Sequence, residues 1–75
     1  MDSLTPGISI TVECPEDILG QVAGSLTKLH ALIKTIEPIG QTFSVEAELP
    51  KTALEEFHKW KQSMSNELIR VTVGG

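Results

Sequence analysis

The order of apolar patterns along the chain constrains its fold more than any other feature. Apolar and polar residues alternate over Ile8–Glu13, which predicts a strand with one buried face. Apolar residues then recur at steps of three and four from Leu19 to Leu29, which predicts a helix over roughly residues 15–30. The chain therefore begins with a strand that leads directly into a helix.

Three residues add detail to this helix. Pro15 is expected at its first position, where the missing N–H of proline costs nothing. Gly20 and Gly24 stand four residues apart, so they either let the helix approach a neighbour closely or lie exposed at a cost of ~1 kcal/mol each.

The middle of the chain predicts two further strands joined by a turn. Leu32–Ile36 predicts a second strand of irregular pattern, and Pro38–Gln41 predicts the turn that follows it. Apolar residues alternate with polar ones over Phe43–Leu49, so a third strand with one wet face is expected there. Pro50 is expected to end that strand.

A second helix is expected between the third strand and a closing strand. Thr52 and Glu55 stand at the spacing of a capping box, in which each side chain bonds the backbone N–H of the other residue. The alternation over Ile69–Val73 predicts the closing strand. The inward-facing residues of the second helix are predicted to be Ala53, Leu54, Phe57, Trp60 and Met64.

Six elements in this order predict an α+β fold of the ferredoxin-like βαββαβ type. Such a fold is a sandwich of one four-stranded antiparallel sheet with two helices on one face. We expect a single domain over residues 1–75, with its core over residues 8–73. A core this small leaves only ~3–5 kcal/mol of net stability, which a homodimer interface would increase. The open face of the sheet is expected to carry Ser9, Thr11, Glu13, Ser44, Glu46 and Glu48.

Charge and cysteine content narrow the classes of function. The net charge is −4 and the lysines form no run, which disfavours generic nucleic-acid binding. Cys14 is the single cysteine and forms no intrachain disulfide, so a reducing, cytoplasmic location is expected. No segment reaches the ~20 apolar residues of a transmembrane helix, so no membrane association is expected. His30 and His58 are too dispersed for a metal site, and no cofactor is indicated.

Five features spread along the chain match one known family. They are Pro15-Glu16-Asp17 followed by Leu19-Gly20, the region of Leu26, the run Glu46–Pro50, Phe57 at the position of a family aromatic, and Ser63–Ser65 at the start of a loop. Together they resemble the C-terminal domain, domain V, of translation elongation factor G, and the resemblance implies the ferredoxin-like fold. No Gly-x-x-x-x-Gly-Lys-Ser/Thr string is present, so no GTPase activity is expected. We therefore expect a stand-alone, non-catalytic interaction module, linked to translation through a protein partner or the ribosome, and not an enzyme.

The departures from this family fall at its basic loops. The family carries paired arginines and a glycine at the end of the first helix, where this chain has Lys28-Leu29-His30-Ala31. Gln62 replaces a further arginine, and Asn66–Leu68 replaces a longer loop rich in Gly and Arg. The resemblance implies that those loops meet ribosomal RNA, so phosphate contacts should be weaker in this chain. The residues expected to keep a binding role are Lys28, His30, Lys34, Lys59, Lys61 and Gln62.

Two other functions fit parts of the sequence. The pair Gly74-Gly75 is typical of ubiquitin-like sulfur or protein-modifier carriers, although those folds begin with a hairpin. The predicted topology is also that of ACT domains, which are regulatory modules that bind small ligands. Glu13-Cys14-Pro15 would then form the ligand loop, but it contains no glycine. Cys14 itself is expected to be packed or to cap a helix, because no basic residue is adjacent to activate it.

Overall fold

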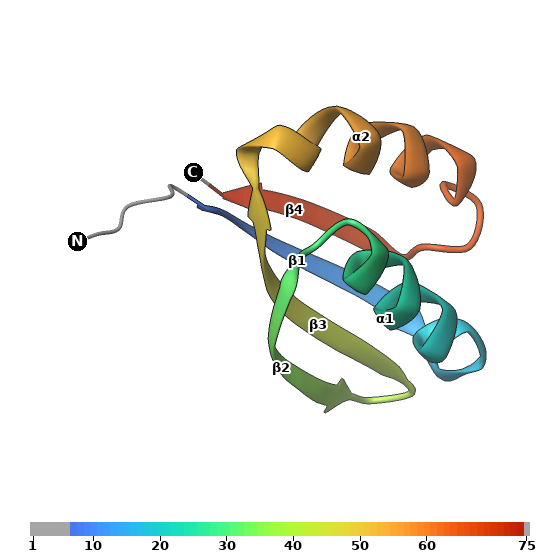
Figure 1. Cartoon of the computed structure of the whole chain (residues 1–75). Coiled ribbons are helices and arrows are strands. Elements are labelled where there is room, and N and C mark those ends of the chain that lie inside the picture. The colour runs from blue at the N-terminus through green and yellow to red at the C-terminus, as the bar shows by residue number, and fades with distance from the viewer. Residues whose placement is uncertain (1–6, 75) are drawn as a thin grey trace.

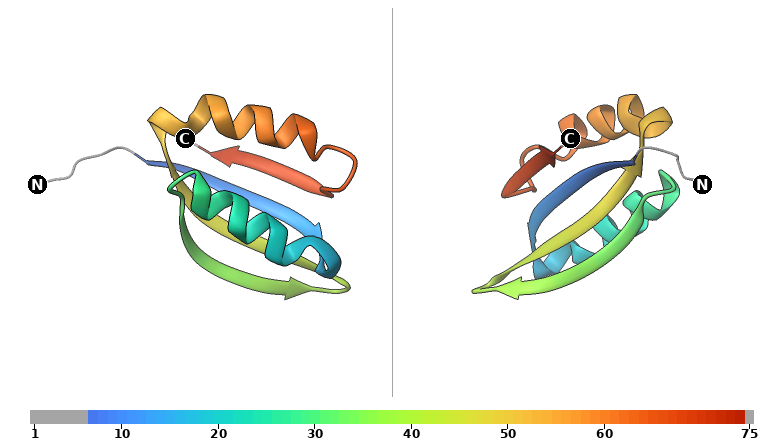
Figure 2. Two further views of the ribbon diagram at one scale, coloured as in Figure 1. Left: turned by 45° about the vertical axis from the view of Figure 1, so that its right-hand side comes forward. Right: turned by 90° about the vertical axis from the view of Figure 1, so that its left-hand side faces the viewer.

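The computed structural model of the chain describes residues 7–74 (Figure 1). The sheet has four antiparallel strands in the order β2-β3-β1-β4, and both helices cover one of its faces (Figure 2). This is the ferredoxin-like arrangement that the sequence predicts. No helix within residues 7–74 is long and apolar enough to span a membrane. The elements are β1 (Gly7–Pro15), the 3₁₀ turn η1 (Glu16–Ile18), α1 (Leu19–Lys28), β2 (Leu32–Ile39), β3 (Thr42–Pro50), the 3₁₀ turn η2 (Lys51–Ala53), α2 (Leu54–Ser63) and β4 (Arg70–Gly74).

Both helices begin later than predicted, because each follows a 3₁₀ turn. Pro15 is the last residue of β1 and precedes η1 with an extended backbone, so it is not the first residue of α1. Thr52 lies inside η2, and no side-chain hydrogen bond caps α2, so the predicted capping box is wrong. A capping residue must stand before the first turn in extended conformation, and Pro50 occupies that place.

The core lies between the sheet and the two helices. β1 and β3 are the central strands, and their inward residues stand opposite one another, as Val12 does with Val45. Each fully buried side chain of this kind contributes about 1.5–3 kcal/mol of transfer free energy. The stripes predicted on the strands and helices therefore meet in a single cluster. Its buried members are Ile10, Val12, Cys14, Val22, Leu26, Val45, Ala47, Leu49, Ala53, Phe57 and Met64.

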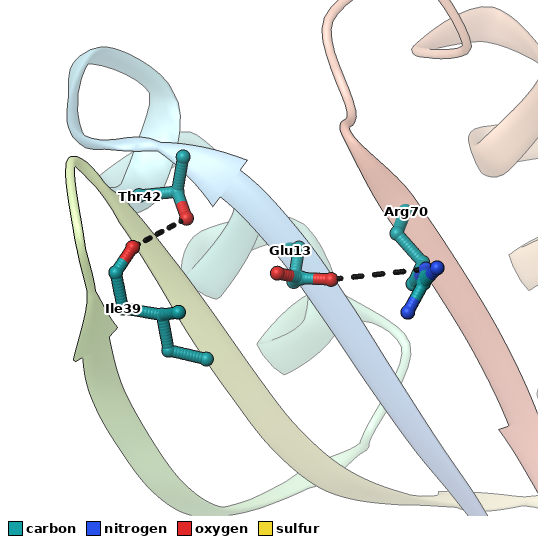
Figure 3. A network of polar contacts seen from close by, with 4 residues as sticks. All are labelled: Glu13, Ile39, Thr42 and Arg70. Atoms are coloured by element: carbon teal, nitrogen blue, oxygen red, sulfur yellow. Dashed lines mark hydrogen bonds and ion pairs between the residues drawn. The ribbon is translucent and has the colours of Figure 1, made fainter.

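The opposite face of the sheet is left uncovered by the helices (Figure 2). The polar residues predicted for it lie there, as Thr11 does opposite Glu46. Thr35 of β2 donates a hydrogen bond from Oγ1 to Oε1 of Glu46 at 3.2 Å. Oε1 of Glu13 and Nε of Arg70 lie 3.9 Å apart across β1 and β4 (Figure 3). Solvent screens this ion pair, because the Arg70 side chain is 74% exposed, and its contribution to stability is therefore small.

The turn between β2 and β3 is shorter than predicted. Pro38 and Ile39 belong to β2, which leaves Gly40 and Gln41 as a two-residue loop. A proline is tolerated in this strand because β2 lies at the edge of the sheet. Gly40 has φ +62°, in the left-handed region that favours glycine. Thr42 closes the loop by donating from Oγ1 to the carbonyl oxygen of Ile39 at 2.9 Å (Figure 3).

Gly20 and Gly24 lie exposed on α1. Apart from its chain neighbours and the nearby backbone of α1, a Cβ atom added at either position would meet nothing within 4 Å. Of the two explanations that the sequence leaves open, close approach to a neighbour is therefore wrong and simple exposure is correct. Each glycine costs α1 about 1 kcal/mol relative to alanine.

Gly24→Ala and Gly40→Ala are predicted to change stability in opposite directions. Alanine at position 24 removes the glycine penalty inside α1, so the free energy of unfolding should rise by about 0.5–1 kcal/mol. Alanine at position 40 must adopt a left-handed backbone, so the same quantity should fall by about 1 kcal/mol. Guanidinium unfolding followed by circular dichroism measures both changes. A loss of stability in Gly24→Ala would contradict the open surroundings of that position.

Candidate binding groove

The C-terminal end of α1 is built as a Schellman motif. The backbone N–H of His30 donates to the carbonyl oxygen of Thr27, and that of Ala31 donates to the carbonyl oxygen of Leu26, both at 3.0 Å. These two bonds satisfy carbonyl groups that the last turn of a helix leaves without partners. His30 has φ 65° and occupies the left-handed position of the motif, where glycine is the usual residue. The motif ends α1 and turns the chain toward β2.

The helices α1 and α2 run over the same face of the sheet (Figure 1). Residues of both helices line a groove. Its volume is about 280 Å³, and it is lined by Ser25, Lys28 and Leu29 of the α1 end and by Glu56 and Trp60 of α2. Leu29 and Trp60 are half-buried against the core and supply an apolar part. Lys28 and Glu56 are exposed, one on each helix, and supply opposite charges. The groove therefore suits a partner side chain that combines an apolar body with a polar or charged group.

Trp60 belongs to the core and to the groove at the same time. Its ring packs on Phe57, with centroids 5.7 Å apart and planes inclined by 34°. The indole Nε1 is buried and has no hydrogen-bond partner among the described residues. A buried N–H left without a partner costs about 1–3 kcal/mol, so this ring is held in place by its packing. The inward-facing residues predicted for α2 therefore include one, Trp60, that also reaches the surface.

The structure distributes the predicted binding residues over several places. Lys28 lines the groove between the helices. His30 lines a second hollow of about 170 Å³, together with Gly7 and Pro50, and Lys61 lines a third of about 280 Å³ beside β4. Lys28 and His30 share the C-terminal end of α1, and Lys61 and Gln62 share the C-terminal end of α2. The predicted residues outside all three hollows are Lys34, at the register shift of β2, and Lys59 and Gln62, both exposed on α2.

The sizes of these hollows bear on the other functions that the sequence suggests. Small-ligand sites typically have volumes of ~300–1,000 Å³. The hollow at His30 is smaller, and the other two lie at the lower end of that range, where a partner side chain also fits. The loop Glu13-Cys14-Pro15, expected to hold a ligand in an ACT-like module, lines none of the three. Gly74 of the carrier prediction is the last residue of β4 and stands opposite Ser9, and Gly75 lies outside the described residues.

Cys14 is packed into the core, as the sequence predicts. Burial raises the pKa of its thiol above the ordinary value of 9.0. The thiol is therefore protonated and unreactive near neutral pH. Because the folded-state pKa lies above the unfolded value, the contribution of the thiol to stability is intact below pH 9.0 and is lost as the pH rises through the folded pKa.

Comparison with known families gives one match. The family described as Elongation factor G C-terminus matches residues 4–68, which include β1, β2, β3 and both helices. A search of curated proteins finds no match. The resemblance predicted from dispersed motifs is confirmed over most of the chain.

Cys14 should react slowly with a thiol reagent in the native protein. The side chain is inaccessible and its pKa is raised, so labelling at neutral pH should require unfolding. Ellman's reagent, followed by absorbance in native buffer and in guanidinium, compares the two rates directly. Labelling in native buffer as fast as in guanidinium would contradict the buried position.

His30→Gly should stabilise the protein by relieving the left-handed backbone at the end of α1. The free energy of unfolding should rise by about 1 kcal/mol. His30→Ala is the matched control, because it also removes the imidazole but keeps a Cβ atom at φ 65°. Denaturant unfolding of both variants separates the effect of the left-handed backbone from the effect of removing the imidazole. An equal gain in His30→Ala would show that the side chain, and not the backbone, is the source of the strain.

Proposed function

The chain belongs to the elongation factor G C-terminus family, and we propose that it is a non-catalytic interaction module of translation. The partner proposed is a protein component of the ribosome, which the chain binds through the C-terminal end of α1 and the adjoining groove. The observation that carries the proposal is the position of Lys28, which lies in that groove beside a half-buried tryptophan.

The groove lies at the same end of α1 where the resemblance places the family's contact with the ribosome. The resemblance implies that family members contact the ribosome through basic residues at this helix end. Here the same end is shaped by the Schellman motif at His30 and carries Lys28 in place of an arginine pair. The chain therefore contacts the ribosome at the same helix end as the family, but through Lys28 and the groove in place of an arginine pair.

Charge and hydrophobicity favour a protein partner over RNA. The open face of the sheet presents carboxylates, among them Glu46 and Glu48, and the net charge of −4 repels phosphate. In the groove, Glu56 accompanies Lys28, which weakens attraction to a polyanion. Leu29 and Trp60 offer apolar contact of the kind that anchors protein side chains.

Co-sedimentation with bacterial ribosomes tests this function. The wild-type protein should pellet with ribosomes at physiological salt, because an interface with apolar contacts is less sensitive to salt than phosphate binding. Lys28→Glu should weaken the affinity by about tenfold, since it places a second negative charge beside Glu56. The double variant Lys28→Glu/Lys34→Glu extends the test to the start of β2. Binding is measured as the pelleted fraction over a range of ribosome concentrations.

Lys51→Glu is the control for charge alone. Lys51 is exposed in η2 and lines none of the three hollows, and its reversal changes the net charge by the same amount. The proposal predicts that Lys51→Glu binds like the wild type. If Lys28→Glu and Lys51→Glu weakened ribosome binding equally, net charge would explain the loss, and binding through the groove would be contradicted. Absence of wild-type protein from the pellet at low and at physiological salt would contradict the function itself.

A further inference from the structure

The two edges of the sheet differ in how they are protected. β2 carries a register shift between Ile33 and Thr35, and it also contains Pro38 and the charged residues Lys34 and Glu37. Bulges, prolines and charges of this kind prevent an edge strand from pairing with another chain. β2 is therefore a blocked edge.

β4, at the other edge, has no register shift and no proline, and its one charged residue, Arg70, stands at its first position. It pairs with β1 in one uninterrupted register, from Ser9 opposite Gly74 to Glu13 opposite Arg70. Its central residues Val71-Thr72-Val73 are all β-branched, which favours extended pairing. The edge of β4 therefore lacks the bulge and the proline that block β2, and its single charge lies at one end of the strand.

Apolar side chains are exposed along β4. Val73 is 42% exposed, although its neighbour across the sheet, Ile10, is buried. Ile69, directly before the strand, is 54% exposed. Because Val73 and Val71 stand opposite Ile10 and Val12, both valines lie on the helix-covered side of the sheet. The core of the domain therefore ends at this edge with apolar groups that are only partly covered by residues 7–74.

We propose that β4 pairs antiparallel with β4 of a second copy of the chain, about a two-fold axis that passes through Thr72. In this register Thr72 stands opposite itself, Val71 opposite Val73 of the second copy, and Arg70 opposite Gly74. The two sheets become one continuous sheet of eight strands, in which the helices of both copies lie on the same face. This inference goes beyond the proposed function and does not depend on it.

The register follows from the strand itself. A shift by one residue would place the valines of the helix side opposite residues of the open face, which pairing across a sheet does not allow. An axis through Val71 or Val73 keeps the faces matched but pairs fewer residues of Arg70–Gly74 within the strand. The axis through Thr72 pairs all of them, brings no like charges together, and places threonine opposite threonine, a favourable cross-strand pair.

A hollow beside β4 is complementary to this arrangement. It has a volume of about 280 Å³ and is lined by Ile69, Arg70 and Val71 together with Lys61, Ser65 and Leu68. Val73 of the second copy stands opposite Val71, at the rim of the hollow, and its side chain points to the same side of the sheet. The exposed valine of each copy is thereby covered by the hollow of the other.

The size of the contact sets its strength. Stable interfaces bury about 1,200–2,000 Å² in total, and a ladder of five residues with one hollow on each side is small by that measure. We therefore expect reversible association with a dissociation constant in the micromolar range. The dimer should be populated in concentrated protein and dissociate on dilution.

Like charges at the two-fold axis provide a test that is specific for this register. Thr72 is exposed, so Thr72→Lys and Thr72→Glu should each fold. In either variant alone, two identical charges stand directly opposite one another, and the dissociation constant should rise by about tenfold or more. In an equimolar mixture of the two variants, lysine stands opposite glutamate, and association should return. Sedimentation equilibrium over a range of protein concentrations measures all four samples, with circular dichroism to verify folding.

Thr35→Lys is the matched control on the blocked edge. Thr35 is likewise an exposed threonine on the open face of an edge strand, and its substitution should leave association unchanged. A wild-type protein that sediments as a monomer at every concentration would overturn the proposal. So would a dimer that Thr35→Lys disrupts while Thr72→Lys does not. Failure of the mixed variants to associate would overturn the two-fold register through Thr72.

Discussion

The pairing of β1 with β3 is the contact that organises this domain. The two strands run antiparallel in one register, from Gly7 opposite Pro50 to Pro15 opposite Thr42. That register brings the buried residues of both strands onto the same side, so the two helices meet a single apolar surface. A slip by one residue would turn the apolar side chains to the open face and the carboxylates toward the helices. The edge strands and both helix stripes are arranged around this central pair.

One face of the sheet is buried in the core, so the side chains that bind partners must lie on the other surfaces of the domain. The remaining surfaces are the acidic open face, the two sheet edges, and the outer sides and ends of the two helices with the groove between them. Elongation factor G C-terminal domains share the fold, and partner choice within a fold lies in particular side chains. In this chain the end of α1 carries Lys28 in a partly apolar groove, and β4 offers an edge with no register shift and no proline. Both features leave the core unchanged, which allows one scaffold to serve different contacts.

Sequence patterns predicted the parts of the structure that depend on burial. Period-2 and helical spacing report burial directly. The order of strands and helices along the chain and core residues such as Val12 and Phe57 therefore follow from them. The predicted start of α1 was wrong because a proline followed by acidic residues is equally compatible with a 3₁₀ turn. The 3₁₀ turn before α2 likewise follows a proline, Pro50. The groove was not predicted, because no local pattern records the approach of Lys28 to α2. His30 was predicted as a binding residue, and its left-handed backbone gives it a role in ending α1.

Native-state amide hydrogen exchange in dilute solution, followed by NMR, tests the dependence of the fold on its central strands most directly. Amides exchange only when the hydrogen bonds that protect them open, so the slowest ones mark the last structure to unfold. We predict that the slowest amides lie in β1 and β3, around Val12 and Val45, and that those of β2 and β4 exchange sooner. Slowest exchange in an edge strand, with earlier exchange in β1 and β3, would contradict the central role of this pair.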